Sequence, residues 1–547
     1  MDYKERYNEW LLFDDDTKQE LLKITDEKEI EDRFYKDLAF GTGGMRGIMG
    51  AGPNRMNRYT ISRATLGLAN YLSDFPTPQK SVVIAYDSRN NSEDFAKCAA
   101  EVLAVKGITV YLFDKITPTP VLSFAVRHLG CIAGIVITAS HNPKEYNGYK
   151  VYDENGCQLV PLLADKVIAH VQEITDYRAV PRLDFGVALQ SGMIQMVGDE
   201  VLDAFLDAVK TQALYTEPSK LKIVYTPLHG TGNIPVRRIL KDYSVSVVKE
   251  QAVPDGDFST VRSPNPEEKD ALNLAIEQAK TEAADLVLGT DPDCDRVGIA
   301  VRHNGDYYVL LTGNQVGALL ADFVLRFKAD TRNEKSTLVK TIVTNDLGAN
   351  IGRKYGLQIV ETLTGFKYIG DQINRYEKTG EKEFVMGYEE SYGYLVGTHA
   401  RDKDAVVASM LICEMTAYHK NNGKTLVDAL EEIYKEYGYY LDALDSFVLQ
   451  GIDGVQKMNA VLDALRARGA SAFPDVETVQ DFSEGIGDLP KENVLKYLFR
   501  NGSWLAVRPS GTEPKLKVYY SVRGESREAA AEQLSALREQ MKAVVEA

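Results

Sequence analysis

Short apolar runs alternate with longer amphipathic stretches along most of the chain. The run SVVIAY at 81–86 is followed by EDFAKCAAEVLAVKG at 93–107, and ITVYLF at 108–113 and IAGIVIT at 132–138 continue the alternation. Short apolar runs between polar turns predict buried strands, and amphipathic stretches of this length predict helices. Strands that alternate with helices favour α/β domains with a mostly parallel sheet.

The same alternation begins again twice. KLKIVYTPLHGTG at 220–232 and TLVKTIVTNDLGAN at 337–350 each have the pattern strand, loop, helix, which indicates an internal repeat. The last part differs, because 503–522 has the pattern strand, loop, strand and 526–547 that of an amphipathic helix. Residues 1–40 have the pattern of helices. We predict three similar α/β domains with mixed sheets and a smaller α+β C-terminal domain, at 1–205, 206–310, 311–435 and 436–547.

Charge and cysteine content narrow the functional classes. Among the 547 residues, 63 Lys and Arg stand against 79 Asp and Glu, a formal net charge of −16. Such a charge repels nucleic acid and anionic membranes, although its simpler explanation is solubility. The five Cys are scattered without a CxxC pair, which favours a reducing compartment. The N-terminus has no signal-peptide pattern, and no apolar run approaches the roughly 18 residues of a membrane span. We expect a cytoplasmic protein with no nucleic-acid or membrane partner.

The loop TASHNPKEYNGYKVY at 138–152 follows a predicted buried strand. Ligands of α/β sheets bind where strands end, so Ser140, His141 and Lys150 are candidate site residues. A serine is a poor nucleophile without a base, a metal or a positive field nearby. The GxSxG pattern of hydrolases is missing here. The alternative is a polar loop that only closes a strand.

The loop in ADLVLGTDPDCDRVGIAV at 284–301 places Asp291, Asp293 and Asp295 at alternate positions. Carboxylates this close repel one another unless a cation neutralises them. An EF-hand would need Gly and Glu where Arg296 and Arg302 stand. Oxygen ligands alone favour Mg²⁺, and Arg296 would suit a phosphate beside the metal. The alternative is a solvated acidic turn.

Two later loops have the residues of an anion site and a sugar site. In VRPSGTEPKLKVYY at 507–520 an arginine fork, two hydroxyls and a glycine suit a phosphate, although a plain β-turn would have similar residues. In VMGYEESYGYLVGTHARDKDAV at 385–406 the acidic and hydroxyl groups suit sugar hydroxyls, and a solvated loop is an equal alternative. The candidates are Arg508, Ser510, Gly511 and Thr512 in the first loop and Glu389 and Ser391 in the second.

Taken together, the four loops resemble those of the α-D-phosphohexomutase superfamily, and most closely its phosphoglucomutase branch. TASHNPKEYNGYK is similar to the phosphoserine loop and GTDPDCDR to the metal loop. GYEESYG is similar to the sugar-binding loop and RPSGTEPKLKVY to the phosphate-binding loop. TPLHGTG at 226 and TLTGFK at 362 match as well, so the resemblance spans nearly the whole chain. It implies four domains around a central cleft, three alike and one smaller.

The resemblance also implies roles for individual residues. Ser140 would be phosphorylated and would hold Mg²⁺ together with Asp291, Asp293 and Asp295. Arg46 and Lys150 would serve proton transfer, with His141 a further catalytic candidate. The implied substrate-binding residues are Thr364 and Gly365 for sugar choice, Glu389 and Ser391 for sugar hydroxyls, and Arg296, Lys403, Arg508, Ser510, Gly511 and Thr512 for phosphates. Some members have a His in the sugar loop where Tyr392, Gly393 and Tyr394 stand here, which leaves His399 as a candidate second acid or base.

The implied reaction interconverts α-D-glucose 1-phosphate and glucose 6-phosphate through a phosphoserine enzyme. Glucose 1,6-bisphosphate would be the intermediate and activator. A phosphomannomutase or phosphopentomutase with the same mechanism is the nearest alternative. A sugar-phosphate phosphatase and a non-catalytic binding scaffold are more remote ones. The expected partner is a hexose phosphate, and the protein is expected to be a monomer or a homodimer.

Overall fold

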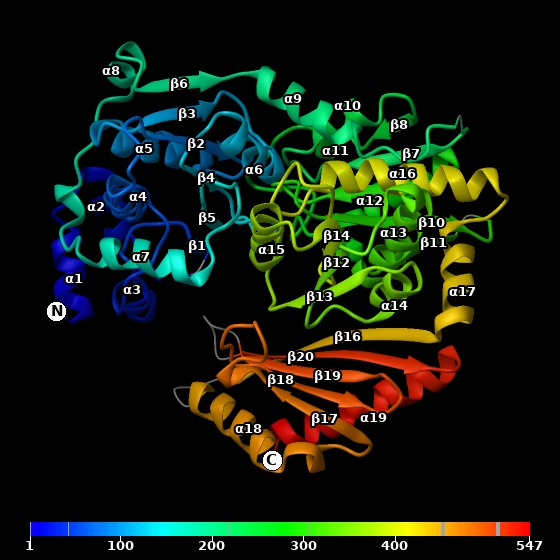
Figure 1. The fold of residues 1–547 in the computed structure, drawn as a ribbon. Helices are drawn as coiled ribbons and strands as arrows, with labels where there is room; N and C mark the ends of the chain where they lie inside the picture. Colours follow the sequence, from blue (N-terminus) through cyan, green and yellow to red (C-terminus); the bar gives the residue numbers. More distant parts are fainter. Residues whose placement is uncertain are drawn as a thin grey trace. The chain divides into compact units, whose positions relative to one another are not determined.

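The fold is taken from a computed structural model that describes residues 2–41, 43–217, 219–305, 307–449, 454–509 and 515–546. Its strands form four sheets, drawn in Figure 1. The chain divides into two compact units. Unit 1 comprises Met1–Gly313, Phe366–Gly387 and Ser391–Gly423, and unit 2 comprises Asn314–Gly365, Tyr388–Glu390 and Lys424–Ala547.

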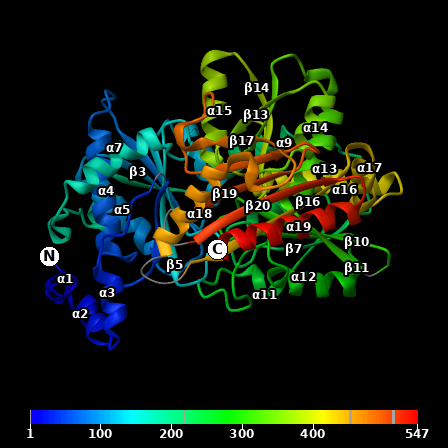
Figure 2. The same cartoon turned by 90° about the horizontal axis from the view of Figure 1, so that it is seen from below.

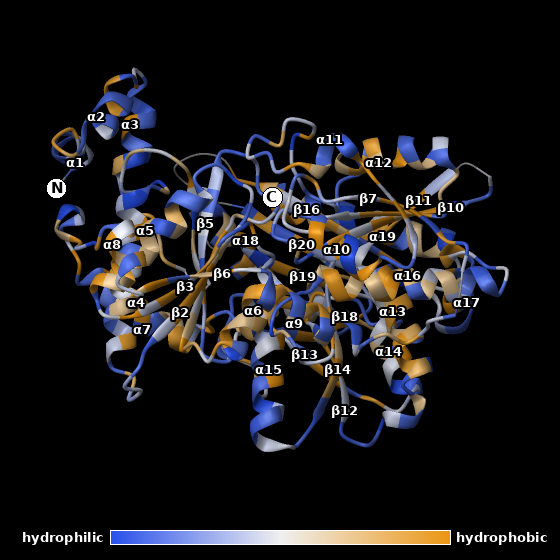
Figure 3. Ribbon diagram, turned by 90° about the horizontal axis from the view of Figure 1, so that it is seen from above, coloured by the Kyte–Doolittle hydropathy of each residue, from blue (hydrophilic) through white to orange (hydrophobic). Residues whose placement is uncertain are grey.

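The first sheet has the order β1-β5-β4-β2-β3-β6. Its central strand β4 is buried along its whole length and β2 at every position after Ser81, and in Figure 3 both lie mostly in the hydrophobic colour range. The strands are β1 (Gly44–Ile48), β2 (Ser81–Tyr86), β3 (Thr109–Phe113), β4 (Ala133–Ile137), β5 (Tyr146–Tyr152) and β6 (Ile194–Val197). The helices of this part are α4 (Arg58–Ser73), α5 (Ser92–Val105), α6 (Thr119–His128), α7 (Pro161–Gln172), α8 (Phe185–Gln190) and α9 (Asp199–Lys210).

The predicted parallel arrangement is confirmed for the central strands, and the sheet as a whole is mixed. β2 pairs in parallel with β3 and β4, whereas β5 is antiparallel to both β4 and β1. The reason lies in the connection, because the short loop 138–145 between β4 and β5 leaves no room for a crossover helix. The same loop is the predicted phosphoserine loop, so the antiparallel return brings β5 back beside it.

The second sheet has the order β11-β10-β9-β7-β8 and also belongs to unit 1. β7 is parallel to β8 and β9, and β10 turns back antiparallel to β9 across the predicted metal loop. The strands are β7 (Lys222–Thr226), β8 (Ser244–Val247), β9 (Leu286–Thr290), β10 (Val297–His303) and β11 (Tyr307–Leu311), and the helices are α10 (Asn233–Ile239), α11 (Lys249–Ala252) and α12 (Lys269–Glu282).

The third sheet has the order β13-β12-β14-β15, and the fourth, β16-β20-β19-β18-β17, is antiparallel throughout. In Figure 2 α19 runs along the strands of the fourth sheet, and it packs on β16 and β20. The remaining elements are α13 (Gly313–Phe327), β12 (Ser336–Thr341), α14 (Leu347–Lys354), β13 (Gln358–Thr362), α15 (Phe366–Thr379), β14 (Glu383–Glu389), β15 (Gly393–Val396), α16 (Ala405–Asn421), α17 (Leu426–Tyr437), β16 (Tyr439–Val448), α18 (Gly454–Arg468), β17 (Val476–Asp481), β18 (Leu495–Phe499), β19 (Trp504–Pro509), β20 (Lys515–Gly524) and α19 (Arg527–Glu546).

The predicted N-terminal helices are α1 (Tyr3–Trp10), α2 (Asp15–Leu22) and α3 (Glu27–Phe34). They share a small aromatic core in which the Trp10 ring contacts the rings of Phe34 and Tyr59. Arg33 joins them to the loop after β1, since its Nη1 pairs with Glu20 Oε1 at 2.6 Å and donates to the Ala51 carbonyl at 3.0 Å. None of the described helices combines the length and apolar content that a membrane crossing needs.

Unit 2 buries two lysines beside one glutamate. Lys340 Nζ lies 2.6 Å from Glu361 Oε1, and Lys496 Nζ lies 3.9 Å from the same oxygen and over the Trp504 ring. Lys496 is only 2% exposed. Burial lowers the pKa of Lys496 to about 8, and the attraction of Glu361 offsets only part of this effect, to which the repulsion of Lys340 adds. The charged form of Lys496 is therefore poorly accommodated in the folded state.

We predict that Lys496→Met stabilises unit 2 at pH 7 by about 3 kcal/mol, as the pKa difference implies. Folded Lys496 releases its proton near pH 8, whereas the unfolded chain keeps it to about pH 10.4. Between these pH values the unfolded state binds more protons than the folded state, so Lys496 makes the stability of the wild type rise with pH. The stability difference between the variant and the wild type therefore shrinks as the pH rises.

The measurement is urea unfolding from pH 7 to 9.5 in a Trp10→Phe background. Of the two tryptophans in the chain, this background keeps Trp504. Lys354→Met, which removes a half-exposed lysine paired with Glu436, is the control and should show no such trend. A stability difference that stays constant over this pH range would contradict the assignment.

Candidate active site

Ser140 lies directly beyond the end of β4, where the sequence predicted it. Its side chain is buried, and Oγ donates to Asp291 Oδ2 at 2.7 Å. The Oγ also lies 3.3 Å from His141 Nδ1. The backbone of Ser140 is left-handed, with φ of 52°, a conformation that costs a non-glycine residue about 1–3 kcal/mol. The surroundings of Ser140 therefore hold it in a strained conformation, with Oγ against the aspartate loop.

Asp291, Asp293 and Asp295 lie together on the loop between β9 and β10. All three are buried, and one carboxylate oxygen of each lies within 4.8 Å of the others. The backbone N–H groups of Asp295 and Arg296 donate to Asp291 Oδ1 at 3.1 and 2.9 Å. The Oδ1 atoms of Asp293 and Asp295 are buried and accept no hydrogen bond from any described residue. These orphaned oxygens are what a bound cation would satisfy, so the donor set fits a hard metal ion.

Two buried lysines face the aspartates. Lys150 Nζ lies 2.7 Å from Asp293 Oδ2 and 3.5 Å from Asp295 Oδ2, and Lys403 Nζ lies 3.1 Å from Asp295 Oδ2. Burial and the neighbouring carboxylates raise the pKa of Asp291 well above its usual range. Burial acts in the same direction on Asp293, but Lys150, a hydrogen bond with Asp291 and Lys403 together outweigh it and lower that pKa. Two ammonium groups and the Arg296 guanidinium, whose Nε lies 3.8 Å from Asp295 Oδ1, thus face the three carboxylates.

Asp402 and Tyr152 complete this charged network, and neither was predicted from the sequence. Lys403 donates to Asp402 Oδ1 from its backbone N–H at 2.8 Å and from Nζ at 3.1 Å. Tyr152 OH donates to Asp402 Oδ2 at 2.8 Å. The available signal was periodicity, since Lys150 and Tyr152 are two residues apart on one strand and therefore share a face of β5.

Two threonines donate hydrogen bonds to the metal loop. Thr119 donates from its hydroxyl to Asp293 Oδ2 at 2.9 Å and from its N–H to the Asp293 carbonyl. Thr231 donates from its N–H and its hydroxyl to the Pro292 carbonyl. A Cβ at Gly230 would lie 2.5 Å from Pro292, so this glycine permits the close approach. The TPLHGTG motif therefore supports the metal loop.

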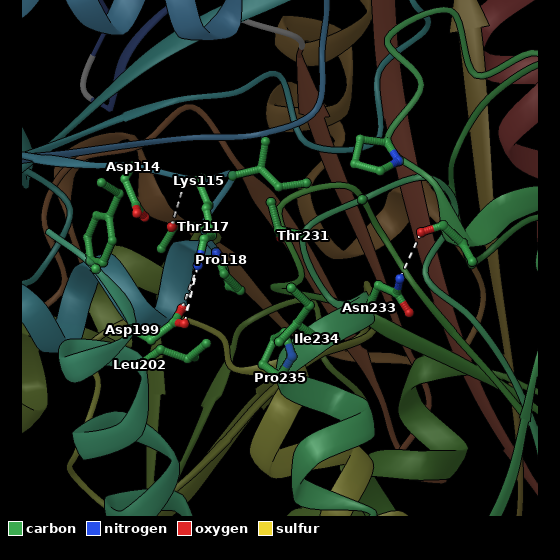
Figure 4. Close-up of a pocket in the computed structure, with 16 residues that line it drawn as sticks. Asp114, Lys115, Thr117, Pro118, Asp199, Leu202, Thr231, Asn233, Ile234 and Pro235 are labelled. Atoms are coloured by element: carbon green, nitrogen blue, oxygen red, sulfur yellow. Dashed lines mark hydrogen bonds and ion pairs between the residues drawn. The ribbon is translucent and has the colours of Figure 1, made fainter. Parts of the chain in front are cut away.

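A cavity of about 240 Å³ lies beside these segments. Figure 4 shows the residues that line it. Thr117 and Pro118 line one wall and Thr231 and Ile234 another, and the pair of Lys115 and Asp199 is drawn at its edge. Among the described residues that line it, none belongs to the aspartate cluster. The cavity is therefore separate from the site and borders the segments that hold the metal loop.

The other predicted residues of unit 1 lie around this cluster. Arg46 stands opposite Gly148 in the β1–β5 register, and its Nη1 donates to Asn142 Oδ1 at 3.0 Å. Arg296 pairs with Glu267 Oε1 at 2.5 Å and forms a backbone bridge with Gly393, two residues after Ser391. Burial and the charges of Arg296 and Arg46 lower the pKa of His141 well below its ordinary value, which favours a neutral ring.

His399, the candidate second acid or base, has a different environment. Its Nε2 lies 2.7 Å from Asp404 Oδ2, and its ring packs against Phe205. Asp404 in turn accepts from the N–H groups of Val406 and Val407 at the start of α16. These contacts support a structural role for His399.

Unit 2 contains the remaining candidates. Glu389 Oε1 accepts from the N–H of Gly365 at 3.1 Å, and the adjacent Thr364 hydroxyl is buried without a hydrogen-bond partner among the described residues. Arg508 lies at the end of β19, 3.2 Å from Glu492 Oε1. Ser510, Gly511 and Thr512 lie outside the described residues. The contact between Glu389 and Gly365 brings two predicted sugar-binding segments together.

Comparison with known families covers almost the whole chain. Four family models of phosphoglucomutase/phosphomannomutase match in order: alpha/beta/alpha domain I at 37–178, domain II at 203–305, domain III at 312–437 and the C-terminal domain at 421–540. The three mixed sheets and the antiparallel fourth sheet agree with this order.

Individual relatives give the same result. A phosphoglucomutase of Staphylococcus haemolyticus is 41% identical over 512 residues, covering 90% of this chain and 91% of that protein. One of Staphylococcus aureus is 37% identical over 526 residues, covering 93% and 94%. A solved Paramecium structure, parafusin (phosphoglucomutase), has a TM-score of 0.70 at 18% identity over 93% of this chain and 95% of that one, which shows the fold alone.

We predict that Thr119→Val weakens binding of a divalent cation about 10-fold, because the hydroxyl that orients Asp293 is lost. Thr119→Ser keeps the hydroxyl and is the matched control. Asp293→Asn should weaken binding more strongly than either. Mn²⁺ titration followed by electron paramagnetic resonance measures the affinities, and equal affinity in the valine and serine variants would disprove the role of Thr119.

Proposed function

Because the chain belongs to the phosphoglucomutase/phosphomannomutase family, we propose that it interconverts α-D-glucose 1-phosphate and glucose 6-phosphate. The observation that carries the proposal is the buried Ser140 Oγ, 2.7 Å from Asp291 in a cluster of three aspartates. Relatives named phosphoglucomutase at 41% and 37% identity support glucose as the sugar.

In the proposed cycle, phosphorylated Ser140 gives its phosphoryl group to the free hydroxyl of a glucose monophosphate. The bond from phosphorus to Ser140 Oγ breaks, a bond to the sugar oxygen forms, and the hydroxyl proton passes to a base. The product of this step is glucose 1,6-bisphosphate. Its other phosphoryl group then returns to Ser140 Oγ, and the isomeric monophosphate leaves. Arg46, Lys150 and His141 are the candidates for proton transfer and for steadying the reacting groups.

Asp291, Asp293 and Asp295 are proposed to hold Mg²⁺ together with an oxygen of phosphorylated Ser140. The oxygen-only donor set and the orphaned Oδ1 atoms of Asp293 and Asp295 support this choice. When bound, Mg²⁺ supplies positive charge against the charge that develops on a transferring phosphoryl group. The protein's own contribution is a water-poor setting in which Lys150 and Lys403 add to that charge.

The sugar and its phosphates are proposed to be recognised by residues of the predicted sugar-binding and phosphate-binding loops. The contact of Glu389 with Gly365 supports a role in binding sugar hydroxyls. The planar Arg508 fork suits a phosphate that does not react. The full proposed set is Thr364, Gly365, Glu389 and Ser391 for the sugar, and Arg296, Lys403, Arg508, Ser510, Gly511 and Thr512 for phosphates.

The proposal extends to domain limits, partners and location. We propose domain limits at residues 205, 310 and 435, and the family matches at 203–305 and 312–437 support them. Glucose 1,6-bisphosphate would serve as activator, because it phosphorylates any enzyme that has lost its phosphoryl group. We also propose a cytoplasmic monomer or homodimer that binds neither nucleic acid nor membrane, in keeping with five unpaired buried cysteines and the charge of −16.

Initial rates on glucose 1-phosphate, mannose 1-phosphate and ribose 1-phosphate, with and without glucose 1,6-bisphosphate, test this function. We expect glucose 1-phosphate to be the best substrate and the bisphosphate to raise its rate. A preference for mannose or ribose would move the enzyme to the phosphomannomutase or phosphopentomutase class with the same mechanism. Release of free phosphate without isomerisation would identify a phosphatase.

We predict that Ser140→Ala loses mutase activity by at least about 10⁴-fold, because the group that carries the phosphoryl between oxygens is gone. Labelled phosphate from glucose 1,6-bisphosphate should appear on the peptide containing Ser140 in the wild type and be missing in the variant. Ser259→Ala, which changes an exposed serine of unit 1, is the control and should leave both readouts unchanged. Normal turnover in Ser140→Ala would refute the phosphoserine cycle.

Arg508→Ala should raise KM for glucose 1-phosphate at least about 10-fold, since a charge-assisted, bidentate contact to the non-reacting phosphate is lost. Arg466→Ala removes an arginine of unit 2 that pairs with Asp481, and it is the matched control. The KM values come from the same initial-rate assay, and thermal unfolding checks the fold of both variants. An unchanged KM in Arg508→Ala would remove this residue from the phosphate site.

A further inference from the structure

Arg89 is a buried arginine with an unusual set of partners. It follows β2 by three residues, and its side chain is 0% exposed. Nη1 donates to the carbonyls of Pro143 and Tyr146 at 2.9 and 3.0 Å, and Nη2 donates to the carbonyls of Ser140 and Asn142. One guanidinium group thus donates hydrogen bonds to four backbone carbonyls of one short segment, which begins at Ser140.

Asp87 links Arg89 to the other side of Ser140. Its Oδ2 lies 3.3 Å from Arg89 Nε and accepts from the Thr138 hydroxyl at 2.6 Å. The same Thr138 hydroxyl accepts from the N–H of Ser140 at 2.8 Å. The N–H and the carbonyl of Ser140 are therefore both held by side chains that meet at one buried carboxylate. The parallel pairing of Tyr86 with Ile137 brings Asp87 and Thr138 together.

A segment of the second sheet's domain covers Arg89. The Phe258 ring lies 5.0 Å from the guanidinium carbon, and a favourable cation–π contact follows. From the same segment, Ser263 donates to the His141 carbonyl at 3.1 Å. Phe258 therefore shields Arg89 from water, which would otherwise compete for the four carbonyls.

We propose that Arg89 is a positioning residue for phosphoryl transfer, which holds Ser140 in its left-handed conformation so that Oγ faces the aspartate cluster. All of its Nη contacts go to backbone carbonyls, so Arg89 acts through Ser140 and not on the phosphoryl group. The arrangement resists relaxation of a strained residue, because relaxing Ser140 would break contacts at its N–H and its carbonyl together. The inference rests on the proposed phosphoserine function.

The test compares Arg89→Lys with Arg63→Lys. Lysine keeps the charge, but one ammonium cannot bond four carbonyls in a plane. Arg63 is a partly buried arginine, 13% exposed at its side chain, that donates to the Ile174 carbonyl and pairs with Asp37, away from Ser140. We expect Arg89→Lys to lower kcat about 100-fold, as misplacement of a reacting group does, with KM for glucose 1-phosphate within about 3-fold of wild type. Arg63→Lys should keep wild-type kcat.

The rate at which glucose 1,6-bisphosphate phosphorylates Ser140, measured by rapid quench and mass spectrometry, is the second readout. It should fall in Arg89→Lys in parallel with kcat. A wild-type protein that is never phosphorylated on Ser140 would overturn the phosphoserine function itself. If the wild type is phosphorylated and Arg89→Lys is phosphorylated at the same rate, only the role of Arg89 is overturned.

Phe258→Leu keeps the test decisive if Arg89→Lys does not fold. Leucine retains apolar cover but loses the ring face, so we expect Ser140 phosphorylation and kcat to fall about 3–10-fold with KM unchanged. If Arg89→Lys does not fold, wild-type rates in a folded Phe258→Leu variant would overturn the proposal.

Discussion

The burial of three carboxylates on one loop is the constraint on which the rest of unit 1 depends. Asp291, Asp293 and Asp295 are 0–1% exposed, and removing charge from water on this scale is unfavourable unless opposite charge is supplied. The fold supplies Lys150 from β5 and Lys403 from the segment before α16. Two parts of the chain more than 250 residues apart therefore meet at this loop, and the strand order of the first sheet is what delivers one of them.

That strand order follows from a short connection. Because the loop after β4 is too short for a crossover, β5 returns antiparallel and presents Lys150 and Tyr152 on one face. Lys150 then pairs with Asp293 and Tyr152 with Asp402, so a single strand contacts both the metal loop and the partner of Lys403. The loop that sets this geometry is also the one that contains Ser140. Ser140, the proposed carrier of the phosphoryl group, and its electrostatic surroundings are thus products of the same chain reversal.

The sequence predicted what is local in the chain and missed what is assembled through space. The three aspartates are separated by single residues and Ser140 follows an apolar run, so their pattern was visible without a structure. The supporting groups were not, because Thr119 lies more than 170 residues from Asp293 and Arg89 more than 50 from Ser140. No period or spacing links such pairs, and only the strand pairing brings them together. The mixed sheets were predicted, but which strand turns antiparallel was not, since an apolar run does not indicate which way its neighbour points.

The contacts around Ser140 all stabilise its strained backbone conformation. A left-handed serine costs about 1–3 kcal/mol, so it persists only where several contacts would be lost on relaxation. Thr138 holds its N–H, Arg89 holds its carbonyl, and Asp87 joins the two. Cys294, inside the metal loop, is also left-handed. The two loops that face each other across the Ser140–Asp291 hydrogen bond therefore both store backbone strain. A site that transfers a phosphoryl group by positioning and charge needs such fixed backbones, because neither loop can then drift when the charge between them changes.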